Sequence, residues 1–249
     1  MKDKITRILL LIVMVFPTLL HAEVIINGTR VILHEKDKES VVQLKNKGKT
    51  PYLLQLWMDN GNPKSRPGEE KVPFIITPPV IRIDPGKGQA VRVLADNPNL
   101  PKDVESIFWF NMLEIPPKPK KTDIKNNNML QMAFRTRIKL FYRPEGLTPT
   151  PLQAYKKLNI SLKGNLLRIK NNSPYFITFT KLEVREDNNS PLLASVIDFH
   201  DRMINPNESI EYKLVEKTKN ALTGKKIFYS IINDYGGEST NEQVLGNDI

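Results

Sequence analysis

The chain has 249 residues, of which 40% are hydrophobic and 26% are charged, and its formal net charge is +10 at pH 7. This composition is typical of a globular protein and excludes a disordered or collagen-like chain. No uninterrupted apolar run reaches the roughly 20 residues that a membrane-spanning helix needs, so we expect no stable membrane insertion.

The first 22 residues have the pattern of an export signal. Lys2, Lys4 and Arg7 give a positive start, residues 8–16 form an apolar run, and Ala22 ends the segment with a small residue. We therefore predict that residues 1–22 are a signal peptide that is cleaved after Ala22.

The residue types that carry most catalytic and metal chemistry are absent or isolated. The chain contains no cysteine, which excludes disulfides, thiol catalysis and thiolate metal sites. After residue 22 the histidines are His34 and His200, and neither has the spacing of a metal-binding motif. Walker, GxSxG and GxGxxG motifs are also absent. The sequence therefore predicts no catalytic residue, no metal and no cofactor.

Short runs rich in Val, Ile, Leu, Phe and Tyr recur between turn residues and predict an all-β fold. The first series of predicted strands covers residues 24–33, 41–45, 52–58, 74–77, 90–94, 106–114 and 130–143. The second series covers residues 158–162, 166–170, 176–184, 209–214 and 227–232. Residues 144–151 contain three prolines and a glycine and predict a stiff connector. We predict two β-sandwich domains, at residues 23–146 and 147–249, with a weak last strand in the second.

The predicted strand at residues 130–143 is unusually long. Its even positions are mostly apolar, whereas most of its odd positions carry arginine or lysine. At about 3.3 Å per residue it would extend to nearly 50 Å, far beyond a typical strand of about 20 Å. Residues 138–142 can be buried in the first sandwich, which leaves Leu130, Met132 and Phe134 toward its exposed end. Either the domain covers the whole strand, or the strand completes the sheet of another protein.

Six sequence blocks follow the order and spacing of a known family. They are TRVI at residues 29–32, PYLLQLW at 51–57, TPPVIRIDPG at 77–86, FNMLEIPP at 110–117, RIKLFYRP at 137–144 and INDYGG at 232–237. The chain after residue 22 thereby resembles the PapD-like periplasmic pilus chaperones over essentially its whole length. The resemblance implies two immunoglobulin-like domains arranged as a boomerang. It also implies a periplasmic chaperone that caps pilus subunits by donor-strand complementation and delivers them to an outer-membrane usher.

The resemblance also implies roles for particular residues. Leu130, Met132 and Phe134 match the donor strand that inserts into the open groove of a subunit. Arg30 and Lys139 match the two cleft cations that bind the C-terminal carboxylate of the subunit.

A further match concerns the junction between the domains. Glu105, Arg143 and Asp234 correspond to an ionic cluster between the domains that fixes their angle. The loop at residues 118–129 lacks the cysteine pair of the long-loop members, which favours the short-loop subclass. An uncovered donor edge also makes self-association of the unliganded protein an expectation.

Two other functions fit parts of the sequence. A secreted β-sandwich adhesin or pilus structural subunit is the alternative, although a subunit would show one incomplete sandwich instead of two domains. The positive net charge is compatible with a nucleic-acid binder, but the cations are dispersed along strands without an RNA-binding motif, so we expect no nucleic-acid partner.

Overall fold

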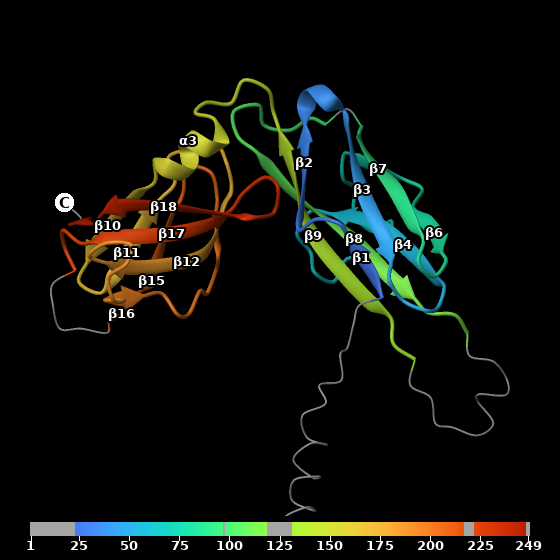
Figure 1. Cartoon of the computed structure of the whole chain (residues 1–249). Coiled ribbons are helices and arrows are strands. Elements are labelled where there is room, and N and C mark those ends of the chain that lie inside the picture. The colour runs from blue at the N-terminus through green and yellow to red at the C-terminus, as the bar shows by residue number, and fades with distance from the viewer. Residues whose placement is uncertain (1–22, 97, 119–130, 217–221, 248–249) are drawn as a thin grey trace, which may run out of the picture.

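The structure is a computed structural model that describes residues 23–96, 98–118, 131–216 and 222–247. Two β-sandwich domains meet at one end and diverge at the other, as in a boomerang, and the chain crosses between them at residues 144–150 (Figure 1). The predicted signal peptide and Leu130 lie outside the described residues. Within the described ranges, no helix combines the length and the apolar character needed to cross a membrane.

The first domain consists of two facing sheets. Its elements are β1 (Val24–Ile26), β2 (Arg30–His34), the 3-10 helix η1 (Glu35–Asp37), β3 (Glu39–Asn46), β4 (Tyr52–Asp59), β5 (Phe74–Thr77), β6 (Val80–Ile83), β7 (Gly88–Ala95), β8 (Ser106–Ile115) and β9 (Phe134–Arg143). One sheet has the strand order β1-β3-β7-β5, and the other has the order β2-β9-β8-β4-β6. Alternating side chains of both sheets, such as Val91 in β7 and Phe110 in β8, point inward and are fully buried.

The prediction of one strand over residues 24–33 is wrong. The segment forms two short strands, because β1 pairs with β3 in one sheet and β2 pairs with β9 in the other. Gly28 lies between them with a φ of 137°, a backbone conformation that favours glycine. The chain therefore crosses from one sheet to the other at Asn27, Gly28 and Thr29, which separate two short apolar runs.

The second domain has the same two-sheet construction. Its elements are α3 (Pro151–Lys156), β10 (Asn159–Lys163), β11 (Leu166–Lys170), β12 (Ile177–Arg185), β13 (Ala194–Ser195), β14 (Met203–Ile204), β15 (Ser209–Lys213), β16 (Val215–Glu216), β17 (Lys226–Ile232), β18 (Glu238–Val244) and β19 (Gly246–Asn247). One sheet has the order β15-β11-β10-β19, and the other has the order β16-β13-β12-β17-β18, with β14 paired to β12. Phe179 and Tyr229 are fully buried in its core.

The region after Gly237, where we predicted a weak last strand, forms the seven-residue strand β18 and the two-residue strand β19. β18 pairs with β17 along its whole length, from Ile232 opposite Glu238 to Lys226 opposite Val244. Its side chains are mostly polar and alternate between exposed and half-buried. The strand lies at the sheet edge, where main-chain hydrogen bonds suffice and a continuous apolar face is not required.

Candidate functional site

The candidate site begins with an unpaired edge of β9. On one side β9 pairs with β8 from Phe134 to Tyr142, but on the other side it pairs with β2 only from Lys139 to Arg143. Along residues 134–138, no described strand occupies that second side. Figure 1 shows β9 on the side of the first domain that faces the second domain. An open strand edge of this kind is a template for adding a strand from another chain.

Large apolar side chains accompany this open edge. Phe134 is 50% exposed and Met132 is 52% exposed, whereas Leu140 and Tyr142 further along the strand are buried in the core. Phe134, Leu140 and Tyr142 share one face of β9, because side chains alternate along a strand. The apolar stripe therefore continues from the core of the first domain onto its surface.

The expected start of this strand needs correction. Residues 131–133 are not in a strand, and β9 begins at Phe134. The partner strand β8 ends at Ile115 and is followed by Pro116 and Pro117, which have no N–H to donate to a ladder. The side chain of Gln131 instead donates to the carbonyls of these two prolines, at 3.3 and 2.9 Å.

Two positively charged side chains, Arg30 and Lys139, lie at the end of the open edge of β9. Arg30 is the first residue of β2 and lies directly opposite Lys139 of β9. The Arg30 Nη1 donates to the carbonyl of Ile232 in the second domain at 3.1 Å, while its buried Nε has no hydrogen-bond partner among the described residues. The Lys139 Nζ contacts the Met203 Sδ, also in the second domain, at 3.2 Å. A thioether is a weak acceptor, so both cations retain unused donors.

The environment of these cations disfavours their charged forms. Burial lowers the pKa of Lys139, and the neighbouring positive charge of Arg30 lowers it further. Burial likewise lowers the pKa of Arg30. Within the described part of the chain, no carboxylate forms a salt bridge with either residue. An anion that entered the cleft would therefore find two cations that are positioned but not neutralised.

A buried ion cluster joins the two domains next to this site. The Arg143 Nε donates to Glu105 at 2.7 Å, and its two terminal nitrogens donate to Asp234 at 2.6 and 2.8 Å. Arg143 is the last residue of β9, whereas Asp234 lies on the turn between β17 and β18. Tyr155 of α3 also donates to Asp234, at 3.2 Å. The structure thus brings together the three residues that the family resemblance singled out.

The pKa values of the two acids in the cluster are shifted in opposite directions. Burial raises the pKa of Asp234, but the hydrogen bonds and charge of Arg143, together with the hydrogen bond from Tyr155 and the charge of Arg30, leave that pKa below its ordinary value. Burial dominates at Glu105 and raises its pKa, even though Arg143 and the main-chain N–H of Phe176 oppose the shift. The bond from Phe176 comes from the second domain at 3.0 Å, so Glu105 also links the domains directly.

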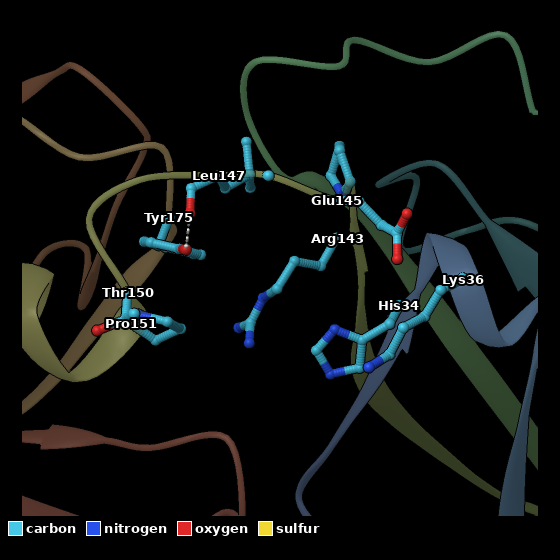
Figure 2. Close-up of a pocket in the computed structure, with 10 residues that line it drawn as sticks. His34, Lys36, Arg143, Glu145, Leu147, Thr150, Pro151 and Tyr175 are labelled. Atoms are coloured by element: carbon cyan, nitrogen blue, oxygen red, sulfur yellow. Dashed lines mark hydrogen bonds between the residues drawn. The ribbon is translucent and has the colours of Figure 1, made fainter.

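A cavity of about 250 Å³ lies on the connector side of this cluster. Figure 2 shows the Arg143 side chain extending into it, with His34 and Lys36 on one side and Tyr175 on the other. The Arg143 guanidinium lies 5.1 Å from the centre of the Tyr175 ring. In the part of the chain that the structure describes, no group of three His, Asp or Glu side chains could hold a metal ion.

The second domain also touches the start of β2 directly. Gly236, on the turn between β17 and β18, has a φ of 80°, and a Cβ placed on it would lie 2.6 Å from the Thr29 Oγ1. Any other residue at position 236 would require the Thr29 side chain to shift and would also adopt an unfavourable positive φ. The sequence patterns do not predict this contact, the hydrogen bond from Arg30 to the Ile232 carbonyl, or the contact between Lys139 and Met203. Each of them joins residues that are far apart in the chain.

Comparison with known proteins agrees with this architecture. The family model "Pili and flagellar-assembly chaperone, PapD N-terminal domain" matches residues 23–148, and "Pili assembly chaperone PapD, C-terminal domain" matches residues 153–243. The chain is 41% identical over 225 residues to the probable fimbrial chaperone YadV of Escherichia coli strain K12, covering 87% of each chain. It is 36% identical over 234 residues to the chaperone protein MrkB of Klebsiella pneumoniae, covering 93% of this chain and 96% of MrkB.

Solved structures show the same similarity. The crystal structure of the YadV chaperone has a TM-score of 0.71 at 36% identity and covers 90% of this chain and 100% of that one. The CupB2 chaperone of Pseudomonas aeruginosa has a TM-score of 0.72 at 31% identity and covers 89% of this chain and 100% of that one. Both domain models describe chaperones, which decides against the alternative of an adhesin or a structural subunit. The chain therefore belongs to the PapD family of pilus-assembly chaperones.

Proposed function

We propose that this fimbrial chaperone caps a pilus subunit by lending the open edge of β9 to the incomplete sheet of the subunit. The observation that carries the proposal is the open edge of β9 at residues 134–138. The exposed apolar side chains of Met132 and Phe134 lie at its start, and Lys139, paired with Arg30 of β2, follows its end. Main-chain hydrogen bonds along such an edge give affinity, and side chains at alternate positions give specificity.

The strand arrangement favours a chain end as the ligand. β2 runs parallel to β9 and begins at Arg30, so it already occupies the edge of β9 from Lys139 onward. A subunit strand that lay parallel to β9 along residues 134–138 would be collinear with β2 and would have to stop before it. The C-terminal strand of a subunit meets this requirement, whereas an internal strand would collide with β2.

Arg30 and Lys139 would then bind the terminal carboxylate. Each charge-assisted hydrogen bond to such a group is worth about 1.5–3 kcal/mol when water is excluded. The unpartnered Nε of Arg30 and the thioether contact of Lys139 leave donors for this purpose. Because a carboxylate marks one defined position of a chain, these bonds would also set the register of the subunit strand.

Phe134 and Met132 would enter the groove of the subunit, together with Leu130, which lies outside the described residues. Burying a large apolar side chain fully contributes about 1.5–3 kcal/mol, and these two described side chains have about half of their surface left to bury. The ion cluster of Glu105, Arg143 and Asp234 would hold the domains, divided between residues 146 and 147, at the angle that shapes the cleft.

The remaining parts of the proposal rest on the sequence and on family membership. The N-terminal residue pattern supports cleavage of the signal peptide after Ala22, and the missing cysteine pair supports the short-loop subclass. Family membership supports a location in the periplasm and delivery of the capped subunit to an outer-membrane usher. Self-association through the open edge of β9 is proposed for the unliganded protein, because an exposed edge pairs readily with another edge.

Recovery of a co-expressed subunit tests the proposed mechanism. A subunit that co-purifies with the chaperone from its native periplasm would be expressed with the wild type, Lys139→Ala or Phe134→Asp. The matched controls are Lys157→Ala, which removes an exposed lysine, and Ile75→Asp, since Ile75 is 51% exposed in the same domain as Phe134. We expect the first two variants to lose the subunit while both controls protect it. Equal recovery from all strains would reject the mechanism.

A further inference from the structure

A buried carboxylate lies on the opposite face of the sheet from the apolar stripe. Asp59, the last residue of β4, is 0% exposed. It accepts hydrogen bonds from the Arg137 Nε at 3.0 Å, the Asn111 Nδ2 at 2.8 Å and the main-chain N–H of Gly61 at 2.8 Å. A second bond from Arg137 makes that pair bidentate. Bidentate arginine–carboxylate pairs combine strength with a fixed geometry.

A second arginine of β9 joins the same network. The Arg135 side chain donates to the Asn111 Oδ1 at 2.7 and 3.0 Å, to the Pro63 carbonyl at 2.7 Å, and to Ser65 at 3.1 Å. Its Nη2 also lies 3.4 Å from Asp59. Pro63 and Ser65 belong to the loop after β4, so Arg135 connects β9 to a segment beyond its neighbouring strand β8.

Both arginines are also stacked on indole rings. The Arg135 guanidinium lies 4.7 Å from the centre of the Trp57 ring, and that of Arg137 lies 4.5 Å from the centre of the Trp109 ring. The side chains of Arg135 and Arg137 are only 24% and 22% exposed. Contacts of this type add to the hydrogen bonds and restrict the rotamers of both side chains.

The position of the network along β9 is informative. Arg135 and Arg137 lie in the stretch at residues 134–138, which pairs with β8 on one side only, whereas residues 139–142 are held between β8 and β2. A strand with one neighbour opens more easily than a strand with two. Because side chains alternate between faces, fixing Arg135 and Arg137 also fixes the direction of Phe134 on the opposite face.

We propose that Asp59, Asn111, Arg135 and Arg137 form a clamp that preorganises the open edge of β9 for the subunit, an inference that rests on the proposed function. They are positioning residues, since none of them lies on the face that would meet the subunit groove. Holding the edge extended before binding lowers the ordering cost of association.

The charge state of Asp59 agrees with the clamp. Burial by itself raises the pKa of this carboxyl, but hydrogen bonds from Arg137, Asn111 and Gly61 outweigh burial and hold the pKa below its ordinary value. The carboxylate is therefore charged at neutral pH and keeps both guanidinium groups in place.

Hydrogen exchange of the free, full-length chaperone tests the clamp without any subunit. In Asp59→Asn, we expect the amides of residues 134–138 that bond to β8 to exchange at least about tenfold faster, while amides in β3 and β7 keep their protection. The matched control is Arg185→Ala, which removes a guanidinium of similar exposure, 26%, that pairs with Glu183 in the second domain. The control should leave β9 unchanged.

A second variant covers the case in which Asp59→Asn does not fold. Arg135→Ala removes one arm of the clamp and leaves Arg137 on the carboxylate, so it should give the same local increase in smaller measure. Unchanged exchange at residues 134–138 would overturn the proposal, and so would an increase spread evenly over the first domain, which a purely structural role predicts.

The rate at which a subunit is captured completes the test and separates it from the proposed function. The clamp variants should capture a co-purified subunit more slowly than the wild type, while the captured complex should still require Phe134. Normal capture by Phe134→Asp would refute donor-strand binding, yet the exchange experiment would still decide whether the clamp orders β9. Unchanged capture rates in clamp variants with loosened β9 would overturn preorganisation.

Discussion

Truncating Phe134 to alanine should separate the affinity for a subunit from the stability of the chaperone. An aromatic side chain buries about 150–250 Å² in total, and Phe134 is 50% exposed in the free protein, which leaves about 100 Å² to be covered on binding. At about 25 cal/mol per Å², the truncation should cost about 2.5 kcal/mol of binding free energy. That loss corresponds to a dissociation constant raised about seventyfold.

The control for this prediction is Ile75→Ala. Ile75 is 51% exposed and lies in β5, in the other sheet of the same domain. Both truncations remove a half-buried apolar side chain, so both should lower the free energy of unfolding in denaturant. Only Phe134→Ala should lose affinity, because only this side chain lies beside the open edge of β9.

The assay is an equilibrium competition in which tagged wild-type and variant chaperones share a limiting amount of folded subunit. Urea unfolding of the free proteins would be measured in parallel, so that affinity can be compared at known stability. Equal partition of the subunit between the Phe134→Ala and Ile75→Ala proteins would refute the reasoning, since the two side chains would then be equivalent in the complex.

Three further predictions concern the cleft and the contact between the domains. Arg143→Met leaves Glu105 buried without its cation, so it should lower the free energy of unfolding by about 3–5 kcal/mol. The variant should also change the small-angle scattering profile. An unchanged profile would show that the cluster does not set the domain angle. Gly236→Ala should lower the free energy of unfolding in urea by roughly 1–3 kcal/mol. Adding Thr29→Ala to the same chain should recover part of this loss, because it removes the Oγ1 that the new Cβ meets. If no stability is recovered, the loss comes from the backbone conformation alone. Binding of a peptide that carries the last residues of a subunit should be constant from about pH 5, where its terminal carboxylate is ionised, up to the pKa of Lys139, which burial lowers from 10.5. Binding should weaken as the pH rises through that pKa, because a bound carboxylate favours the ammonium form. Fluorescence anisotropy with Lys139→Arg as control should show this limb shifted to higher pH.

Much of the architecture is determined by local pattern in the sequence. The predicted strands at residues 74–77 and 166–170 coincide with β5 and β11. The alternation toward the end of β9 correctly predicts that Leu140 and Tyr142 are buried. A period of two is a property of neighbouring residues, so it is readable before any long-range contact is known.

The sequence pattern does not predict strand boundaries correctly where they depend on pairing with a neighbouring strand. The start of β9 depends on where β8 meets Pro116, and the division between β1 and β2 depends on which sheet each one joins. β18 is a strand because β17 pairs with it, although its side chains are mostly polar. In each case hydrogen bonds to a distant segment outweigh the local side-chain preference.

Some residues of the candidate site can be identified from the sequence, whereas others are recognised only in the folded structure. Arg30 and Lys139 are identifiable only by their match to a family, since a cation in a β-strand looks like any solvent-exposed charge. The buried Asp59 and its two arginines, the Ile232 carbonyl beside Arg30, and the thioether of Met203 emerge only from the folded chain. Composition and periodicity determine that strands form and which of their faces are apolar. Which charges become buried, and against which partners, depends on sheet order and domain contact, because these bring together groups as many as 202 residues apart in the chain.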